Sequence, residues 1–178
     1  MHSMKPGSVL PALVTGSVAS VISTAALLAL SHRETGRAVA ALNGPSQWLW
    51  GRQAAYRRRA RARYTAVGYV IHHLSSLLWA SVYNHPRARR TLPQPTLRAA
   101  AVATLAAAVD YKVVPQRLTP GFEAQLPRGA VALVYGVFAA GLVLGDQLLH
   151  RVSSRPHGLI RASTRLPQRT SAAERHVR

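Results

Sequence analysis

Residues 8–30 read SVLPALVTGSVASVISTAALLAL, and this uncharged stretch of 23 residues decides how the chain is interpreted. At about 1.5 Å per residue, a helix of this length crosses a hydrocarbon layer of roughly 30 Å. It is longer than the hydrophobic part of a cleaved signal peptide, about 7–15 residues, and no clean small-residue cleavage site follows it. We therefore predict a retained transmembrane helix over residues 8–30.

Three more apolar blocks follow, at residues 64–83, 97–114 and 129–149. The block 97–114 is the weakest, because it is rich in alanine and contains Asp110 and Lys112; a soluble helix is the alternative there. If the other three blocks are spans, this block becomes the fourth. We predict an all-α protein, a four-helix integral membrane bundle over residues 1–150. The basic segment 151–178 has no apolar periodicity and is typical of a disordered tail.

The charge of the chain is strongly unbalanced. Its 178 residues carry 23 Lys and Arg against five acidic residues, a formal net charge of +18, and 48% of them are apolar. In a soluble protein this balance would favour nucleic-acid binding, but the basic residues lie mainly between and after the apolar blocks. That placement favours a lipid bilayer with anionic headgroups as the partner, and nucleic acid is not expected. A second copy of the chain or another membrane protein stays open as a partner.

Location follows from the same features. The composition, rich in Ala and Arg, suggests a bacterial source, so we expect a multi-pass protein of the bacterial inner membrane. Lys and Arg are almost equally numerous on the two predicted sides of the membrane, and we favour cytoplasmic termini.

The two halves of the chain share an outline, which suggests two repeated helix pairs. In each half a turn-prone segment follows the first helix, NGPSQWLWG at 43–51 and LTPGFEAQLP at 118–127. Chance matches among alanine-rich segments are the alternative. Trp48 and Trp50 of the first segment are expected to be interfacial anchors at the headgroup level.

Two adjacent histidines, His72 and His73, interrupt the block 64–83. Alternating steps of three and four place one stripe of side chains on a helix: Thr65, Tyr69, His72, Ser76, Trp79 and Tyr83. The stripe collects most of the polar and aromatic groups of the block, so we expect it to face the other helices. His73 lies about 100° around the helix, which makes His72 the better inward candidate and leaves His73 as the alternative.

Asp110 and Tyr135 are expected at a similar depth to His72, in the same half of the bilayer. A carboxylate buried there needs a partner, and an imidazole is a suitable one. We therefore predict an intramembrane polar cluster of His72, His73, Asp110, Tyr69 and Tyr135.

Three roles are open for this cluster: polar contacts that hold the helices together, proton or solute handling, and metal or haem ligation. Two consecutive histidines on one helix cannot hold a haem from both sides, and no zinc-protease or nucleophile-elbow motif is present, so we expect no cofactor, no metal and no catalytic residues. The function favoured is a structural or interaction component of the inner membrane rather than an enzyme. The alternative is a small proton-coupled transporter or carrier.

Three segments carry a resemblance to a known group of proteins: TAVGYVIHHLSSLLWASVY, NGPSQWLWG and DYKVVPQRLTPGFE. Over residues 8–149 the chain resembles small bacterial inner-membrane proteins with four helices and a domain of unknown function. The resemblance implies location and fold, and no activity.

Overall fold

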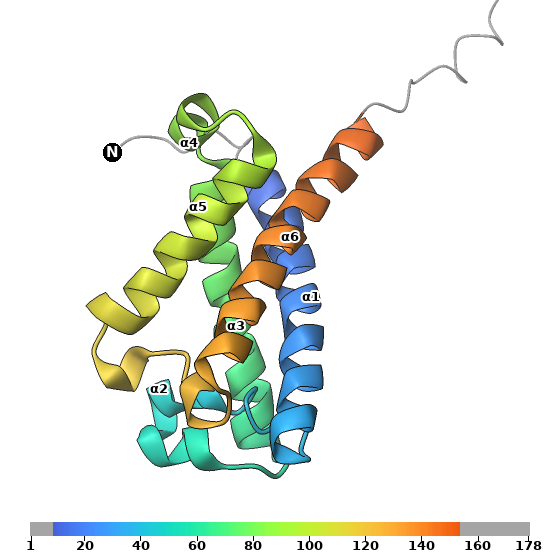
Figure 1. The fold of residues 1–178 in the computed structure, drawn as a ribbon. Coiled ribbons are helices and arrows are strands. Elements are labelled where there is room, and N and C mark those ends of the chain that lie inside the picture. The colour runs from blue at the N-terminus through green and yellow to red at the C-terminus, as the bar shows by residue number, and fades with distance from the viewer. Residues whose placement is uncertain (1–8, 154–178) are drawn as a thin grey trace, which may run out of the picture.

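The computed structural model describes residues 9–153, and every regular element within them is helical. Four long helices form the body of the molecule (Figure 1): α1 Val9–Thr35, α3 Ala62–Asn84, α5 Pro95–Ala108 and α6 Arg128–Ser153. The connections contain short helices: η2 Gly44–Ser46, α2 Gln47–Trp50, η3 Arg52–Tyr56, α4 Pro86–Thr91, η5 Gln116–Leu118 and η6 Phe122–Ala124. A π-helical turn, η4 Val109–Val113, continues α5. The predicted all-α class is confirmed.

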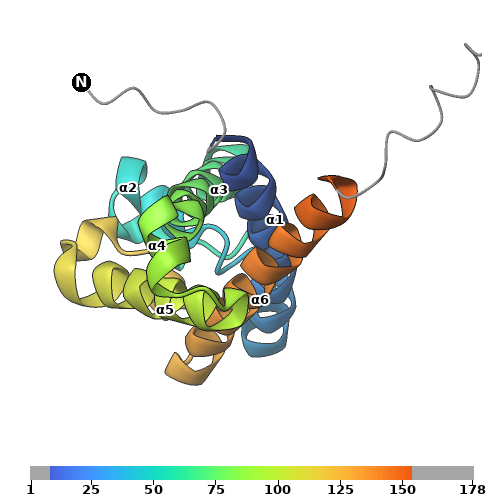
Figure 2. The same ribbon diagram turned by 90° about the horizontal axis from the view of Figure 1, so that it is seen from above.

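The four helices follow one another around the bundle in the order α1, α3, α5, α6 (Figure 2). Helix α1 packs most extensively, against α3 and α6, whereas α5 lies mainly on α6. The connections 36–61 and 114–127 meet at one end of the bundle, here called the loop end; α4 lies at the other, the α4 end.

All four predicted helices differ somewhat in their bounds from the structure, and two of the differences have a clear local cause. The block 97–114 is not one α-helix, because α5 ends at Ala108 and a π turn carries the chain to Val113. Pro115 ends the helix: it restricts Val114 to an extended conformation, observed at φ −76° and ψ 148°. The first helix runs past residue 30 to Thr35. It stops where Gly36 takes a left-handed φ of 68°, a conformation that glycine adopts without steric cost.

Glycines let the long helices approach closely. A methyl group added at Gly141 or Gly145 of α6 would lie 2.6 Å from the Cα atom of Ala19 or Thr15 of α1. On α1 itself, a methyl group at Gly16 would lie 2.8 Å from the side chain of Leu77 on α3. Small residues therefore stand at these helix contacts, where the two backbones nearly touch.

Two of the described helices are long and apolar enough to cross a membrane, Val9–Thr35 and Arg128–Val152. Helix α3 has 23 residues, but its histidines and serines lower its hydropathy, and α5 has only 14 residues. Length and composition therefore support membrane crossing for α1 and α6. Crossing by α3 and α5 stays a prediction.

Candidate functional site

His72 points from α3 toward α1. Its Nε2 atom lies 2.9 Å from Ser23 Oγ, and its ring meets the edge of Phe122 with the centroids 5.9 Å apart. Ser23 is fully buried, and its hydroxyl also donates to the carbonyl of Ser20. The imidazole thus joins α3 to α1 and reaches the loop-end segment that carries Phe122.

Asp110 lies on the π turn after α5 and accepts a hydrogen bond from the Tyr135 hydroxyl of α6 at 2.6 Å. The ring of Tyr111, the next residue, meets the Tyr135 ring edge-on at 6.2 Å. A π turn is wider than an α-helical turn, so it changes the direction of the side chains that follow the regular helix. Turns of this kind are often found at functional sites. This pair links the end of α5 to α6, as the His72–Ser23 pair links α3 to α1.

A cavity lies between the His72–Ser23 pair and the Asp110–Tyr135 pair. The space in it that the centre of a water-sized sphere can occupy is about 50 Å³. This is room for a few water molecules or a very small ligand. Its polar lining comes from His72, Ser75, Ser76, Asp110 and Tyr135, and its aromatic lining from Trp48, Trp79, Phe122 and Phe138.

The structure brings together three residues of the predicted cluster, His72, Asp110 and Tyr135, around this cavity. Within the described chain no hydrogen bond joins His72 to Asp110, because each has another partner. Tyr69 and His73 do not line the cavity; their rings stack on each other at 5.9 Å, one helical turn apart on α3.

The expected anchors Trp48 and Trp50 belong to the short helix α2 at the loop end, where the two residues are 36% and 51% exposed. Trp48 donates through Nε1 to the carbonyl of Thr119 at 3.2 Å, and Trp50 to that of Arg63 at 2.9 Å. Each indole therefore has its polar atom satisfied by backbone while part of its ring stays exposed.

A second polar cluster, at the α4 end, was missed by the sequence reasoning. Asp146 of α6 is buried and accepts bonds from Arg89 of α4 at 2.9 Å, Arg98 of α5 at 3.4 Å and the Tyr83 hydroxyl of α3 at 3.2 Å. The Arg98 guanidinium also stacks over the Tyr83 ring at 4.4 Å. An ion network that joins α3, α4, α5 and α6 in this way fixes helix ends to one another.

The sequence does contain a pattern that indicates this cluster. Asp146 and Arg98 are opposite charges inside apolar blocks, and both belong to the side of the predicted membrane opposite the loop end. Buried charges of this kind need a partner of opposite sign, which would have predicted the pair.

The described residues contain no group of three or more His, Cys, Asp or Glu side chains placed to hold a metal ion. No protein-family model, curated protein or solved structure matches the chain. The resemblance based on the three sequence segments therefore stays a prediction, and the functional argument rests on the geometry of the chain itself.

Proposed function

We propose that the chain is a four-span integral membrane protein that binds a small cation in the partly open cavity between its helices. The observation that carries the membrane assignment is an inverted distribution of polarity. On α3, Ser76 is 3% exposed while Leu78 is 62% exposed; on α1, Ser20 is fully buried while Leu10 is 63% exposed. A soluble protein buries its large apolar side chains first, so this arrangement fits a bundle surrounded by lipid.

The outward apolar residues occur on all four long helices. They include Leu13 and Val21 of α1, Val70 and Leu74 of α3, Leu97 and Leu105 of α5, and Leu133, Leu144 and Leu148 of α6. The helices pack side by side over much of their length, so a membrane that surrounds α1 and α6 also surrounds α3 and α5. This packing supports four spans, although α3 and α5 are less hydrophobic taken alone.

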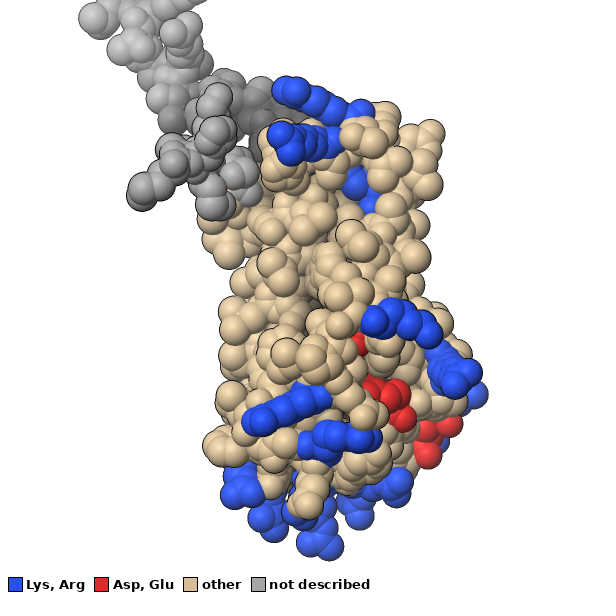
Figure 3. All heavy atoms as spheres, turned by 90° about the vertical axis from the view of Figure 1, so that its left-hand side faces the viewer, with Lys and Arg blue, Asp and Glu red and all other residues tan. Residues whose placement is uncertain are grey.

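The distribution of charge supports the same assignment. Figure 3 looks at the side of the bundle on which α2 and α5 lie; Lys and Arg lie at the α4 end and over the half nearer the loop end, and a belt without them separates the two groups. Basic side chains at both ends of an apolar belt are typical of proteins anchored between two headgroup layers.

The lining of the cavity favours a cation. Asp110 supplies the only carboxylate of the lining, and the rings of five Trp, Phe and Tyr residues border the space. Aromatic faces attract cations, and the lining contains no Lys or Arg that could hold an anion. The small volume fits an ion of the size of ammonium or methylammonium, bound as a small carrier would bind its solute.

A structural role is the second candidate, favoured by one observation. His72 and Asp110 are already hydrogen-bonded across helix pairs, to Ser23 and Tyr135, which is what polar contacts that hold helices together require. If His72→Gln and Asp110→Asn leave the protein folded and its cellular role unchanged, the structural role is supported and the carrier is excluded.

Membrane insertion is tested by extraction of membranes with alkaline carbonate. The chain should stay in the pellet, and recovery in the soluble fraction would contradict the assignment.

Cation binding is tested by titrating the purified chain in neutral detergent with methylammonium, using calorimetry. Asp110→Asn should weaken binding at least tenfold, because it removes the only carboxylate of the lining while keeping the shape of the side chain. Glu34→Gln removes the same charge at the end of α1, away from the cavity, and should leave methylammonium binding unchanged. Equal binding by both variants, or equally strong binding of acetate, would refute the cation site.

A further inference from the structure

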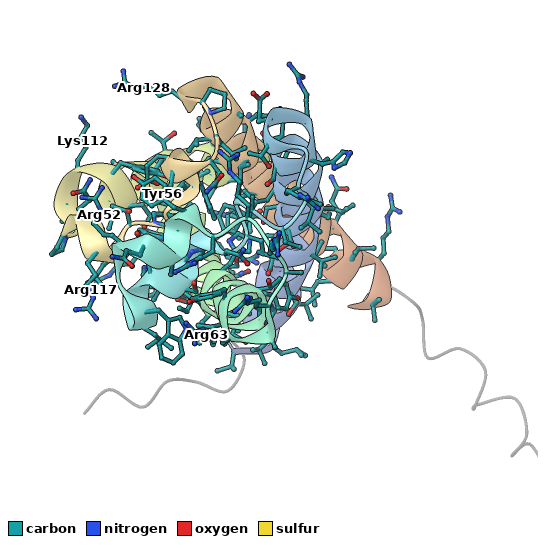
Figure 4. The ribbon with its side chains drawn as sticks, turned by 90° about the horizontal axis from the view of Figure 1, so that it is seen from below. Arg52, Tyr56, Arg63, Lys112, Arg117 and Arg128 are labelled. Atoms are coloured by element: carbon teal, nitrogen blue, oxygen red, sulfur yellow. The ribbon has the colours of Figure 1, made fainter. Side chains whose placement is uncertain are left out.

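The loop end carries a pocket lined by five arginines and two tyrosines. These are Tyr56, Arg57, Arg58, Arg59, Arg61, Arg63 and Tyr64. Figure 4 views this end of the bundle, with Tyr56 and Arg63 among the labelled side chains. We propose that the pocket binds the phosphate headgroup of an anionic phospholipid. This inference rests on the proposed membrane insertion and is separate from the cavity.

The backbone of the arginine segment is held by a buried side chain. Asn43 is fully buried, and its Nδ2 donates to the carbonyls of Arg57 at 2.7 Å and Arg59 at 3.3 Å. Its Oδ1 accepts from the Thr65 hydroxyl of α3 at 2.8 Å. One amide therefore fixes the backbone of the segment against α3, so the fold places the arginine backbone at the loop end while the side chains stay exposed.

Their charges are not neutralised within the described part of the chain. The ion pairs found there involve Arg33, Arg89, Arg98 and His150, and none involves an arginine of the pocket. Arg58 donates to the amide oxygen of Gln125 at 3.2 Å, and Arg63 donates to the Tyr64 hydroxyl. Five guanidinium groups without carboxylates match an anion with several acceptor oxygens, and a phosphate is such an anion.

Aromatic side chains place the pocket at the headgroup level. The Arg63 guanidinium lies 4.6 Å from the centre of the Tyr64 ring and 5.9 Å from that of Trp50. Trp50 and Tyr56 are both more than half exposed beside it. Tryptophan and tyrosine prefer the boundary between headgroups and acyl chains, which is where a lipid phosphate is found.

The surface next to the pocket favours a lipid over free phosphate or nucleic acid. Beyond Arg63 the outer face of α3 continues as the exposed apolar residues Val70, Leu74 and Leu78. A lipid bound by its phosphate in the pocket would lay its acyl chains along this face. Neither inorganic phosphate nor a nucleic acid has an apolar part to cover it.

The test is a titration of the full chain in neutral detergent with phosphatidylglycerol, with the bound lipid counted by native mass spectrometry. Phosphatidylcholine, inorganic phosphate and a single-stranded oligonucleotide serve as competing probes. The variant Arg59→Gln/Arg61→Gln removes two exposed charges from the pocket. The matched control Arg87→Gln/Arg90→Gln removes two exposed charges from α4, at the other end of the bundle.

Each arginine near an anionic surface contributes about fivefold to binding, so the pocket variant should bind phosphatidylglycerol about 25-fold more weakly. The control should change it less than twofold, and phosphatidylcholine should compete poorly. Equal weakening by both variants, or no change in the pocket variant, would overturn the lipid site. So would phosphate or the oligonucleotide competing at the same concentration as the lipid. If the chain stays in the membrane pellet after carbonate extraction but this titration fails, only the lipid site is refuted. If carbonate releases the chain, the membrane assignment is refuted.

Discussion

The contact between α1 and α6 leaves no room for a methyl group at Gly141. An alanine Cβ there would lie 2.6 Å from the Cα atom of Ala19 and 3.2 Å from its Cβ. Ordinary carbon contacts lie near 3.5–4.0 Å, so Gly141→Ala must push the two helices apart by about 1 Å or bend one of them. Overpacking of this kind costs about 1–3 kcal/mol.

The same helix offers a matched control. Gly136, also on α6, has no atom beyond its chain neighbours and its own helix backbone within 4 Å of the position that its Cβ would take. A change from glycine to alanine within a helix adds about 0.5–1 kcal/mol of stability through backbone entropy, and this gain is common to both variants. The difference in the free energy of unfolding between Gly136→Ala and Gly141→Ala therefore isolates the contact, and we expect about 1–3 kcal/mol.

The assay is reversible unfolding of the purified chain in mixed micelles with increasing sodium dodecyl sulfate, followed by tryptophan fluorescence. Gly136→Ala should be as stable as the parent chain or more stable, and Gly141→Ala clearly less stable. Equal stability of the two variants would show that α1 and α6 do not approach as closely as described, and the reasoning from this contact would fail.

Three further predictions use the same unfolding assay. Asp146→Asn should cost about 3–5 kcal/mol, because it leaves the buried Arg98 guanidinium without its carboxylate; a loss under 1 kcal/mol would show that the network is open to water. Asn43→Ala should cost about 1–3 kcal/mol through the backbone carbonyls left without a donor, and faster proteolysis after the arginines of 57–63 should accompany it. Tyr135→Phe and Asp110→Asn should couple by about 0.5–1.5 kcal/mol in a double-mutant cycle, and additive effects would deny their hydrogen bond.

The sequence predicted the helices better than the contacts between their polar groups. Uncharged blocks such as 8–30 are visible as composition, and the stripe on 64–83 follows from helical spacing alone. The partner of His72 was not predictable in this way. Ser23 is one of several small hydroxyl residues on α1, and the one that meets the imidazole depends on how far α1 slides along α3, which close backbone packing determines.

Asp110 shows a different limit. Its depth could be estimated by counting residues, but the π turn that directs it toward Tyr135 has no simple pattern in the sequence. The Asp146 network depends on helix ends that are distant in the chain and meet only in the folded bundle. Its two charges inside apolar blocks were nevertheless visible in the sequence and pointed to a buried pair.

Membrane topology tests the central claim of four spans most directly. The chain has no cysteine, so single cysteines introduced at Gln53, Arg90 and Gln116 can be labelled without background by a reagent that does not cross the membrane. Four spans predict that Gln53→Cys and Gln116→Cys are labelled from one side of the membrane and Arg90→Cys from the other. Labelling of all three positions from the same side would contradict the account, because it would leave only α1 and α6 as crossing helices.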